Sequence, residues 1–481
     1  MNLSNKKTGV VSNRSNRIIL TGGAMVMAIT ASVFAQEKPF MQPGTSQPPP
    51  PPPPPKAAAS GTNAVATASA NPVEKFFGGQ IPNALAQGKF NLNVRLRYEQ
   101  VDEDNQAPFT KNSYAPTVRT RFGYTTAPLY GFQGMLEGVN VSVLGPEHNY
   151  NAAGSNGQGA RPPVGDPPMT RIDQAWMGYS YANYFSAKVG QQQINLDNQR
   201  FIGDAGWRQD MQTYDAIAVK STPVQDLSLY YSFVWDVYRV YGGVSGLPAA
   251  NQNFDSRSHL INVSYSGWKY GRFVGYAYLL DLSNIAGNAN SCATYGGYFA
   301  GAAPVCDRVT IDYRAEFAWQ DEYADNPQKY SAEYYNFELG ASIKPVAFGA
   351  GYELLGSGAN SGAGGGRVGF KTPLASLHPF NGWAEMFTTH PNNGLQDIYG
   401  YAQVTLPGQI PVRAVYHKFD AAYGSSNYGQ EFDVVISKKF GKYWNVMAEF
   451  ADYLGEEAVA APPAGAEVNI QKFWAAVEFN F

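Results

Sequence analysis

Four arginines recur at alternating positions in two short stretches of the chain: Arg95, Arg97, Arg119 and Arg121. A guanidinium binds a carboxylate through two parallel hydrogen bonds, and residues two apart on a β-strand lie on the same face. The spacing therefore predicts a basic ladder on one polar face, which would raise the local concentration of anions. A second interpretation stays open, in which these arginines pair with acids such as Glu99 and Glu137 and only hold the wall together.

The polar face that carries the ladder is not uniformly basic. Arg314 and Glu316 are expected to lie on the same face and to line the same space. Nine acidic residues are expected to point the same way: Asp173, Asp312, Glu316, Glu338, Glu353, Glu431, Asp433, Glu449 and Glu478. Cations on one wall and acids on the other predict a mixed interior with a transverse field, not a uniformly anion-selective tube.

Two long loops, 195–212 and 357–395, are expected to fold inward and narrow the interior. The first carries Arg200, Trp207 and Arg208, and the second carries Asn381, Trp383 and Glu385. Charge beside a flat apolar ring suits a sugar ring and its carboxylate. Loops of any barrel contain such residues, so packing within the loops is the alternative explanation.

Nothing in the chain resembles an enzyme site. The five histidines are not spaced with a serine or a carboxylate on one strand face, and neither zinc-type spacing nor a phosphate-binding loop occurs. Asp102, Glu103 and Asp104 could bind calcium weakly, although a solvated acidic loop explains them as well. We therefore expect no catalytic residue, no metal and no cofactor.

The elements that position these side chains are β-strands. From Lys89 onward, apolar and polar residues alternate with a period of two. Eighteen such segments are expected, with sixteen as the alternative count, at 89–100, 115–126, 132–144, 171–182, 185–194, 213–221, 226–237, 257–266, 271–282, 293–301, 309–320, 333–344, 346–356, 396–406, 410–419, 430–439, 442–453 and 470–481. Because unpaired backbone groups are costly in hydrocarbon, strands in a membrane must close into a barrel. The sequence thus predicts an all-β, antiparallel transmembrane barrel.

Loop lengths give that barrel an orientation. Short turns are expected at 127–131, 222–225, 344–345, 407–409 and 440–441, and long loops at 145–170, 195–212, 238–256 and 357–395. Bacterial barrels have an even number of strands, short periplasmic turns and long outer loops. The aromatic content of 14% and the net charge of -3 agree with membrane lipid and lipopolysaccharide as partners, and give no reason to expect nucleic acid.

The N-terminal part of the chain is expected to be an export signal followed by a linker. Residues 1–35 combine a basic start, a short apolar run and small residues before Gln36, so cleavage is expected after Ala35. Residues 36–87 are rich in Pro and Ala, which predicts a disordered or extended periplasmic linker. This linker either contacts the cell wall or has no partner. The barrel is then expected over 88–481, in the bacterial outer membrane.

Two further features concern the ends of strands. Phe479 and Phe481 end the last alternating segment, which we interpret as a signal for the outer-membrane insertion machinery. Cys292 and Cys306 lie in an oxidising compartment. However, the strand expected at 293–301 would place them at opposite ends of one strand, too far apart for a disulfide.

Several of these stretches together resemble the alginate export family of bacterial outer-membrane β-barrels. They are RLRYE at 95–99, RTRFGY at 119–124, NQRFIG at 198–203, GWRQ at 206–209, TPLASLH at 372–378 and FNGWAE at 380–385. The resemblance covers about residues 80–481 and implies an eighteen-stranded barrel and a path for an anionic uronate polysaccharide. Gly190-Gln191-Gln192 and Arg171 depart from residues common in the family, which puts the substrate in doubt.

These observations lead to one expectation of function and two alternatives. We expect an outer-membrane channel that passes an anionic carbohydrate or another organic anion. The first alternative is a general diffusion porin of low selectivity, and the second is a structural barrel that tethers the outer membrane to the cell wall.

Overall fold

In the computed structural model, the described residues are 80–104, 108–283, 288–456 and 468–481. The expected signal peptide and nearly all of the expected linker lie outside these residues. At the end of the linker, Ile81–Ala86 form a short helix, α2, which the composition did not indicate. The backbone N–H of Ala127 donates to the carbonyl of Ala84 at 3.0 Å, so α2 contacts the turn after the second strand. No helix among the described residues is long and apolar enough to cross a membrane.

Eighteen long strands form one antiparallel wall. They are β1 (Lys89–Asp104), β2 (Ser113–Thr125), β3 (Phe132–Val143), β6 (Met169–Tyr181), β7 (Phe185–Gln192), β8 (Thr213–Val224), β9 (Leu227–Tyr238), β10 (Asn253–Trp268), β11 (Gly271–Leu280), β13 (Cys292–Cys306), β14 (Val309–Glu322), β15 (Ser331–Ile343), β16 (Val346–Leu355), β19 (Leu395–Leu406), β20 (Ile410–Asp420), β21 (Asn427–Phe440), β22 (Trp444–Gly455) and β23 (Asn469–Asn480). The two-residue β12 (Leu282–Ser283) continues the pairing with β10. Every strand predicted from the alternation is present.

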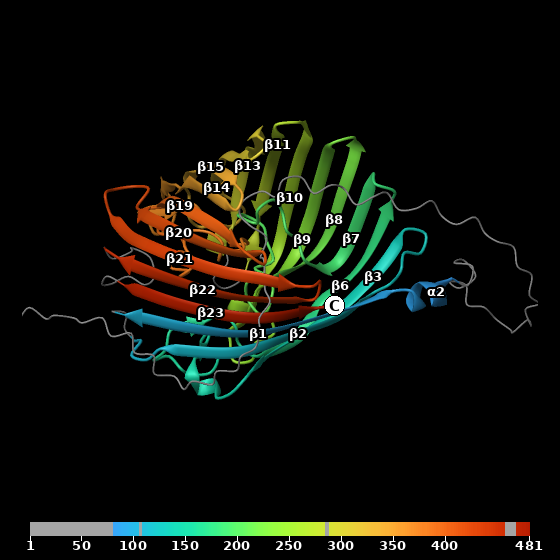
Figure 1. The fold of residues 1–481 in the computed structure, drawn as a ribbon, viewed down its shortest axis with the longest axis horizontal. Helices are drawn as coiled ribbons and strands as arrows, with labels where there is room; N and C mark the ends of the chain where they lie inside the picture. The colour runs from blue at the N-terminus through green and yellow to red at the C-terminus, as the bar shows by residue number, and fades with distance from the viewer. Residues whose placement is uncertain (1–79, 105–107, 284–287, 457–467) are drawn as a thin grey trace, which may run out of the picture. The chain divides into compact units, whose positions relative to one another are not determined.

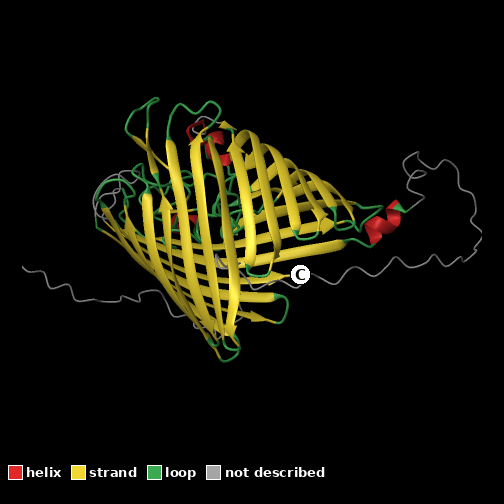
Figure 2. Cartoon of the chain, turned by 90° about the horizontal axis from the view of Figure 1, so that it is seen from above, coloured by secondary structure: helices red, strands yellow, loops and turns green. Residues whose placement is uncertain are grey.

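The wall is closed. β1 pairs with β2 on one side and with the last strand, β23, on the other, with Arg95 opposite both Arg119 and Glu478. Figure 1 shows this meeting of the first and last strands, and Figure 2 shows the strands curving round the barrel. Closure gives every strand two hydrogen-bonded neighbours, so no backbone edge faces lipid. The predicted antiparallel barrel of eighteen strands is confirmed.

Connections alternate in length around the wall. The turns at one end are short, such as 225–226, 269–270, 307–308 and 344–345. Those at the other end are long and contain small elements: η1 (Glu147–Asn149), β4 (Asn151–Ala152), β5 (Pro163–Val164), α3 (Ala249–Gln252), η2 (Asn288–Asn290), β17 (Ser357–Ala359) and β18 (Arg367–Gly369). In bacterial outer-membrane barrels, short turns face the periplasm and long loops face outward, so we expect the same orientation here.

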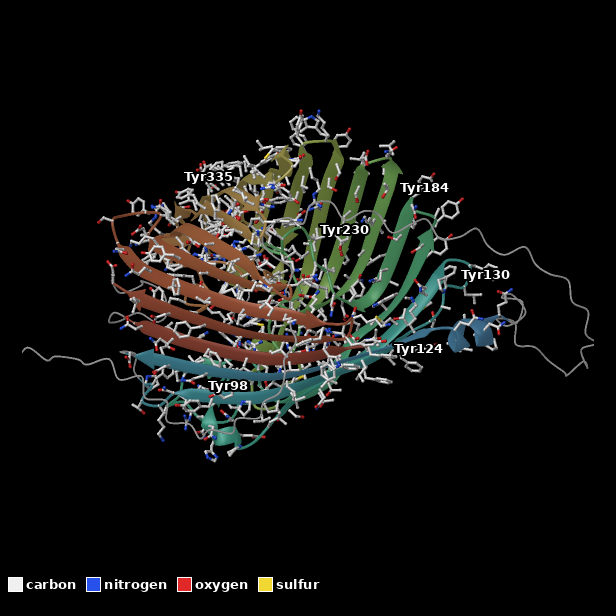
Figure 3. All side chains as sticks on the ribbon, viewed as in Figure 1. Tyr98, Tyr124, Tyr130, Tyr184, Tyr230 and Tyr335 are labelled. Atoms are coloured by element: carbon white, nitrogen blue, oxygen red, sulfur yellow. The ribbon has the colours of Figure 1, made fainter. Side chains whose placement is uncertain are left out.

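Aromatic side chains mark both ends of the outer surface. At the short-turn end, exposed aromatic residues are Phe90, Phe122, Tyr130, Phe132, Tyr181, Tyr184, Trp268, Tyr270, Phe348 and Trp444. Nearer the long loops, they are Tyr114, Trp235, Tyr295, Trp319, Phe432 and Phe473. Figure 3 shows Tyr130 and Tyr184 at one end and Tyr335 towards the other. Such girdles lie at the two membrane–water interfaces of transmembrane barrels.

The hydrophobic core of the protein lies inside the barrel. Two loops, loop 193–212 and loop 356–394, enter the interior and pair with each other through a short bridge between Ile202 and Leu374. Both of these residues are fully buried, as is Phe370. Phe201 packs against Phe370 and against tyrosines of the wall. The two loops expected to fold inward therefore do so, and they fill much of the lumen.

Candidate functional site

Two arginines of the predicted ladder hold loop 193–212 against the wall. Arg95 donates to the carbonyls of Gly206 at 3.1 Å and Trp207 at 3.0 Å, and to Oε1 of Gln209 at 2.8 Å. Arg97 donates to the Trp207 carbonyl and lies 4.3 Å from the centre of the Trp207 ring. These guanidinium groups therefore complete the hydrogen bonding of a loop backbone that enters the barrel.

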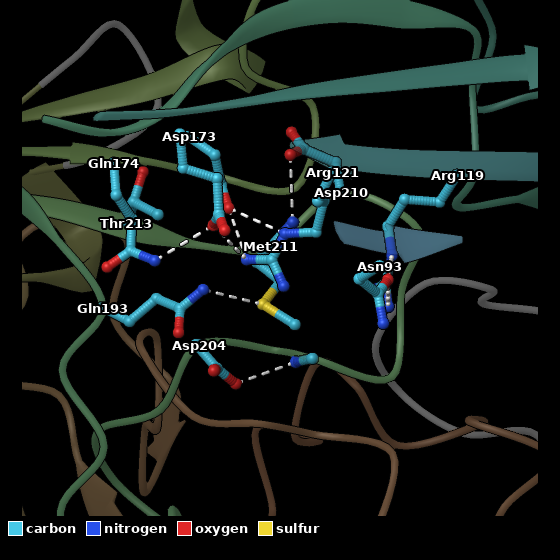
Figure 4. A network of polar contacts seen from close by, with 12 residues as sticks. Asn93, Arg119, Arg121, Asp173, Gln174, Gln193, Asp204, Asp210, Met211 and Thr213 are labelled. Atoms are coloured by element: carbon cyan, nitrogen blue, oxygen red, sulfur yellow. Dashed lines mark hydrogen bonds and ion pairs between the residues drawn. The ribbon is translucent and has the colours of Figure 1, made fainter. Parts of the chain in front are cut away.

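The other two arginines are bound to acids of the wall. Nη2 of Arg119 lies 2.5 Å from Glu478. Nε of Arg121 donates to Asp173 at 2.9 Å, and Arg121 forms an ion pair with Glu137 at 3.5 Å. Figure 4 shows Arg121 beside Asp173, and Arg119 beside Asn93. Both arginines thus have carboxylate partners within the wall.

These contacts correct one expectation about the ladder. All four arginines face the interior, but only 1–8% of each is exposed, so they do not form an open basic surface. The second interpretation, in which the arginines pair with nearby acids, predicted two partners correctly: Arg97 pairs with Glu99 at 3.1 Å, and Arg121 pairs with Glu137. The reason for the difference is loop 193–212, whose course inside the barrel covers the first strands.

Arg314 and Glu316 form a separate buried pair on β14. Nε of Arg314 donates to Glu316 at 2.9 Å, and the guanidinium lies 3.9 Å from the centre of the Tyr298 ring. The hydroxyl of Tyr276 also donates to Glu316, at 2.8 Å. This pair packs the wall and does not line the cavity described below.

In loop 193–212, the three predicted residues are all bonded within the protein. Arg200 is 1% exposed and donates to Glu353 at 2.7 Å and to Asn381 at 2.8 Å, which removes it from contact with solutes. The ring of Trp207 stacks on His378, with centroids 3.7 Å apart. Since Arg97 also covers this ring, Trp207 does not present an exposed ring face on which a sugar could stack, as the sequence had suggested.

Arg208 joins the two loops to the wall. It donates to Glu99 at 3.0 Å and to Glu385. Burial alone would lower the pKa of Arg208, but the carboxylates of Glu385 and Glu99 raise it well above its ordinary value. Arg208 therefore stays charged within the barrel.

The residues predicted in loop 356–394 serve mainly to fix that loop. Asn381 donates to Glu353 at 2.6 Å and to Asp397 at 3.2 Å. Trp383 is half-buried and packs against Tyr401 and Val415 of the wall. Glu385 accepts from Lys472 at 2.8 Å. Burial would raise the pKa of Glu385, but Arg208 and Lys472 hold it well below its ordinary value.

A cavity of about 820 Å³ lies between the two loops and the strands β1, β2, β22 and β23, and it is also lined by residues of other long connections, such as Phe109 and Tyr241. On β23 its lining extends from Ile470, near the loop end, to Glu478, near the short-turn end. Eight residues of extended strand span about 26 Å, so the cavity follows much of the height of the wall. Of the ladder, Arg95 and Arg119 line it.

The charges along this cavity are unevenly compensated. Its acids Glu385 and Glu478 are already paired with cations. Its cations Arg95 and Arg239 have no ion pair with a described carboxylate: Arg95 binds carbonyl and amide oxygens, and Arg239 lies over the Phe254 ring at 4.9 Å. Two further acids, Glu103 and Asp204, also line the cavity and form no ion pair with a described cation. In formal charge, the lining has five cations (Arg95, Arg119, Arg208, Arg239 and Lys472) and four acids (Glu103, Asp204, Glu385 and Glu478), so the excess is a single positive charge.

Sequence reasoning missed three residues of this site. Lys472 alternates with the apolar residues of the last strand, so its place on the inner face was readable from the pattern. His378 and Arg239 lie in loops, where no periodicity indicates which way a side chain points. The positions of these two side chains depend on contacts with segments far away in the sequence.

The remaining predicted features are at the ends of strands. Cys292 and Cys306 are free and lie at opposite ends of β13, as expected, with Cys292 buried and Cys306 exposed. Phe481 is 64% exposed beyond β23; its role in assembly stays a prediction. No group of three or more described acids, histidines or cysteines is arranged to hold a metal.

No protein-family model and no curated protein matches the sequence. Solved structures do match the fold. OccAB3 of Acinetobacter baumannii superposes with a TM-score of 0.62 at 15% identity, covering 82% of this chain and 100% of that one. OpdK of Pseudomonas aeruginosa, solved with vanillate, gives 0.59 at 12%, covering 82% and 100%. OccK9 (OpdG) of the same species gives 0.60 at 11%, covering 83% and 100%.

The chain has the closed β-barrel fold of these bacterial proteins. Its likeness to these structures extends over their whole length, and at these identities it concerns the fold. The resemblance to the alginate export family stays a prediction.

Proposed function

We propose that this barrel is a channel for small organic anions, which pass through the cavity beside β1 and β23. The observation that carries the proposal is the excess of cations over acids on the lining of that cavity, which includes Arg95 and Arg239, two arginines without an ion-pair partner among the described residues. A positive surplus between low-dielectric walls raises the local concentration of anions. Neutral solutes gain nothing from it, so charge is the expected basis of selection.

The size of the path favours small solutes over polymers. Loop 193–212 and loop 356–394 are tied to each other and, through Arg200 and Asn381, to the neighbouring wall strands β16 and β19. The cavity beside them measures about 820 Å³. OpdK, whose fold is similar, was solved with vanillate, a small aromatic carboxylate. Trp207 is covered by His378 and Arg97, so its ring is not available to stack on a sugar.

The test is ion selectivity in planar bilayers. We expect anion selectivity from reversal potentials, and block of the current by vanillate and by a uronate monosaccharide. Neutral glucose should not block. A uronate polymer is included because the resemblance to the alginate export family implies it; block by the polymer alone would overturn the proposal in favour of a polysaccharide path.

Arg239→Gln is the informative variant, since Arg239 has no carboxylate to leave behind. It should shift the reversal potential towards cations, most strongly at low salt, because charges are screened over about 30 Å at 0.01 M but about 8 Å at 0.15 M. Arg257→Gln is the matched control, because the Arg257 side chain is 70% exposed and does not line the cavity. Equal selectivity of Arg239→Gln and the wild type would refute the role of the cavity charges.

A further inference from the structure

Loop 356–394 rests on an acidic part of the barrel wall. Four carboxylates form this acidic wall: Asp397 of β19, Glu431 and Asp433 of β21, and Glu449 of β22. Each is at most 6% exposed. Buried carboxylates so close together repel one another unless cations or protons lie between them. The groups that neutralise the acidic wall therefore decide whether the loop can stay on it.

His378 of loop 356–394 lies between two carboxylates. Its Nε2 is 2.8 Å from Glu449, and its Nδ1 is 3.2 Å from Glu385. An ionised carboxylate only accepts hydrogen bonds, and a neutral imidazole has a single N–H to donate. Both contacts can be hydrogen bonds at once only when both ring nitrogens carry protons. The geometry thus fits an imidazolium ion.

A second histidine repeats this arrangement on the wall itself. Nδ1 of His417, on β20, lies 2.9 Å from Asp397, and its Nε2 lies 3.6 Å from Asp433. The acidic wall therefore contacts two imidazole rings: His417, which belongs to the wall and lies between two of its carboxylates, and His378, which reaches Glu449 from the loop. Of these two histidines, only His378 belongs to a loop.

The surroundings of His378 connect it to the other loop as well. Its ring stacks on Trp207 of loop 193–212 at 3.7 Å and meets Trp474 of β23 edge-on at 5.4 Å. Three other cations lie at this junction: Arg208 and Lys472 are bonded to Glu385, and Arg97 lies over the Trp207 ring. The other acids there are Glu431 and Asp433 of β21. A charged imidazole also binds a Trp face more strongly than a neutral one.

Further contacts of the same loop depend on its position over these acids. The backbone N–H of Ala384 donates to Glu431 at 2.6 Å, and Asn381 donates to Asp397. Asn381 and Ala384 lie three and six residues after His378. Loss of the His378 contacts therefore weakens the hold on one end of a short segment that spans the acidic wall.

We propose that His378 is a proton-operated latch: its protonated ring holds residues 378–385 of loop 356–394 on the acidic wall, and its deprotonation loosens this segment and widens the path. Arg95, Arg200 and Arg208 keep loop 193–212 in place in both states. The sign follows from charge. When the ring is neutral, Glu385 still has Arg208 and Lys472 as partners, but the acidic wall has lost the positive charge beside Glu449. Alkaline conditions should thus open the barrel, and acid should close it.

The ionisation of the loop histidines supports this sign. Burial alone would lower the pKa of His378, but Glu449 and Glu385 outweigh burial and raise it. The stabilising contribution of the protonated ring is therefore fully present below about pH 6.5, the ordinary histidine value, and is lost as the pH rises through the raised value. In contrast, burial lowers the pKa of His390, in the same loop, to about 4, so His390 stays neutral throughout.

The first experiment measures single-channel conductance against pH. The wild type should show a reversible step to higher conductance as the pH rises above about 6.5. His378→Gln should show the high conductance at every pH, while His378→Lys, which stays charged, should keep the low conductance. His148→Gln, in an outer loop, is the matched control and should behave as the wild type. A His378→Gln variant with the wild-type step would overturn the latch.

The second experiment does not depend on conduction, so it separates failure of this inference from failure of the proposed channel function. Carbon-13 NMR of labelled imidazole rings in detergent micelles should show His378 titrating above about pH 6.5, the ordinary histidine value, with its signal assigned by its absence in His378→Gln. Hydrogen exchange of the Ala384 amide should accelerate over the same pH range, beyond the intrinsic increase measured in a peptide. Titration of His378 at or below about pH 6.5, or Ala384 exchange that does not change as His378 titrates, would overturn the latch.

Discussion

The ion pair between Arg200 and Glu353 offers the sharpest test of how the loops are held inside the barrel. Arg200 of loop 193–212 is 1% exposed, and its Nε lies 2.7 Å from Glu353 of β16. Removing one partner of a buried pair costs about 3–5 kcal/mol, because the other charge is left uncompensated. At about 1.4 kcal/mol per factor of ten, Arg200→Met should favour local opening of the loop by roughly a hundred- to a few-thousand-fold.

Hydrogen exchange measures this opening directly. The Gly203 amide donates to the Leu374 carbonyl at 2.9 Å, so it exchanges when the two loops separate. Arg200→Met and Glu353→Gln should each accelerate its exchange strongly. The double variant should recover much of the protection, since replacing both partners removes the unpaired charge. Arg257→Gln is the control. Exchange within about threefold of the wild type in Arg200→Met, or additive effects in the double variant, would refute the reasoning.

Three further predictions follow from other parts of the barrel. Glu385→Gln should lower the midpoint of thermal unfolding at neutral pH. Because the pKa of Glu385 is held well below its ordinary value, the difference in midpoint between variant and wild type should persist down to about pH 4.3 and shrink only below that pH. An impermeant maleimide should modify the exposed Cys306 only when it reaches the short-turn side of the membrane, and should leave the buried Cys292 unmodified until the protein unfolds; labelling of Cys306 on intact cells would reverse the orientation. Deletion of Phe481 should reduce the amount of heat-modifiable barrel in the outer membrane, and unchanged insertion would exclude a role for it in assembly.

The wall was predictable because it depends on short-range information. A period of two in hydrophobicity and the turn residues between segments are both visible within a few residues, and parity together with the need to close the sheet supplied the rest. The same reasoning placed Cys292 and Cys306 at opposite ends of one strand, which the structure confirms.

The interior was much less predictable, because long-range contacts determine it. Arg200 and Glu353 are 153 positions apart, and nothing local indicates that they meet. The phase of the first two strands correctly placed four arginines on the inner face. It could not show that the carbonyls of residues 206 and 207 would occupy Arg95 and Arg97. The pattern thus predicted that the four arginine side chains face the interior, but it could not predict whether a solute can reach them.

The meeting of β1 with β23 has a consequence for biogenesis. Arg119 of β2 reaches across β1 to Glu478 of β23, so this seam joins residues from the beginning and the very end of the barrel. The edge of β1 that pairs with β23 therefore stays unpaired until the last strand has been made and added to the sheet. We propose that the insertion machinery shields that edge in the meantime. A chain that ends before Glu478 would leave the edge exposed permanently. It would also leave Arg119 without its only carboxylate within ion-pair distance among the described residues.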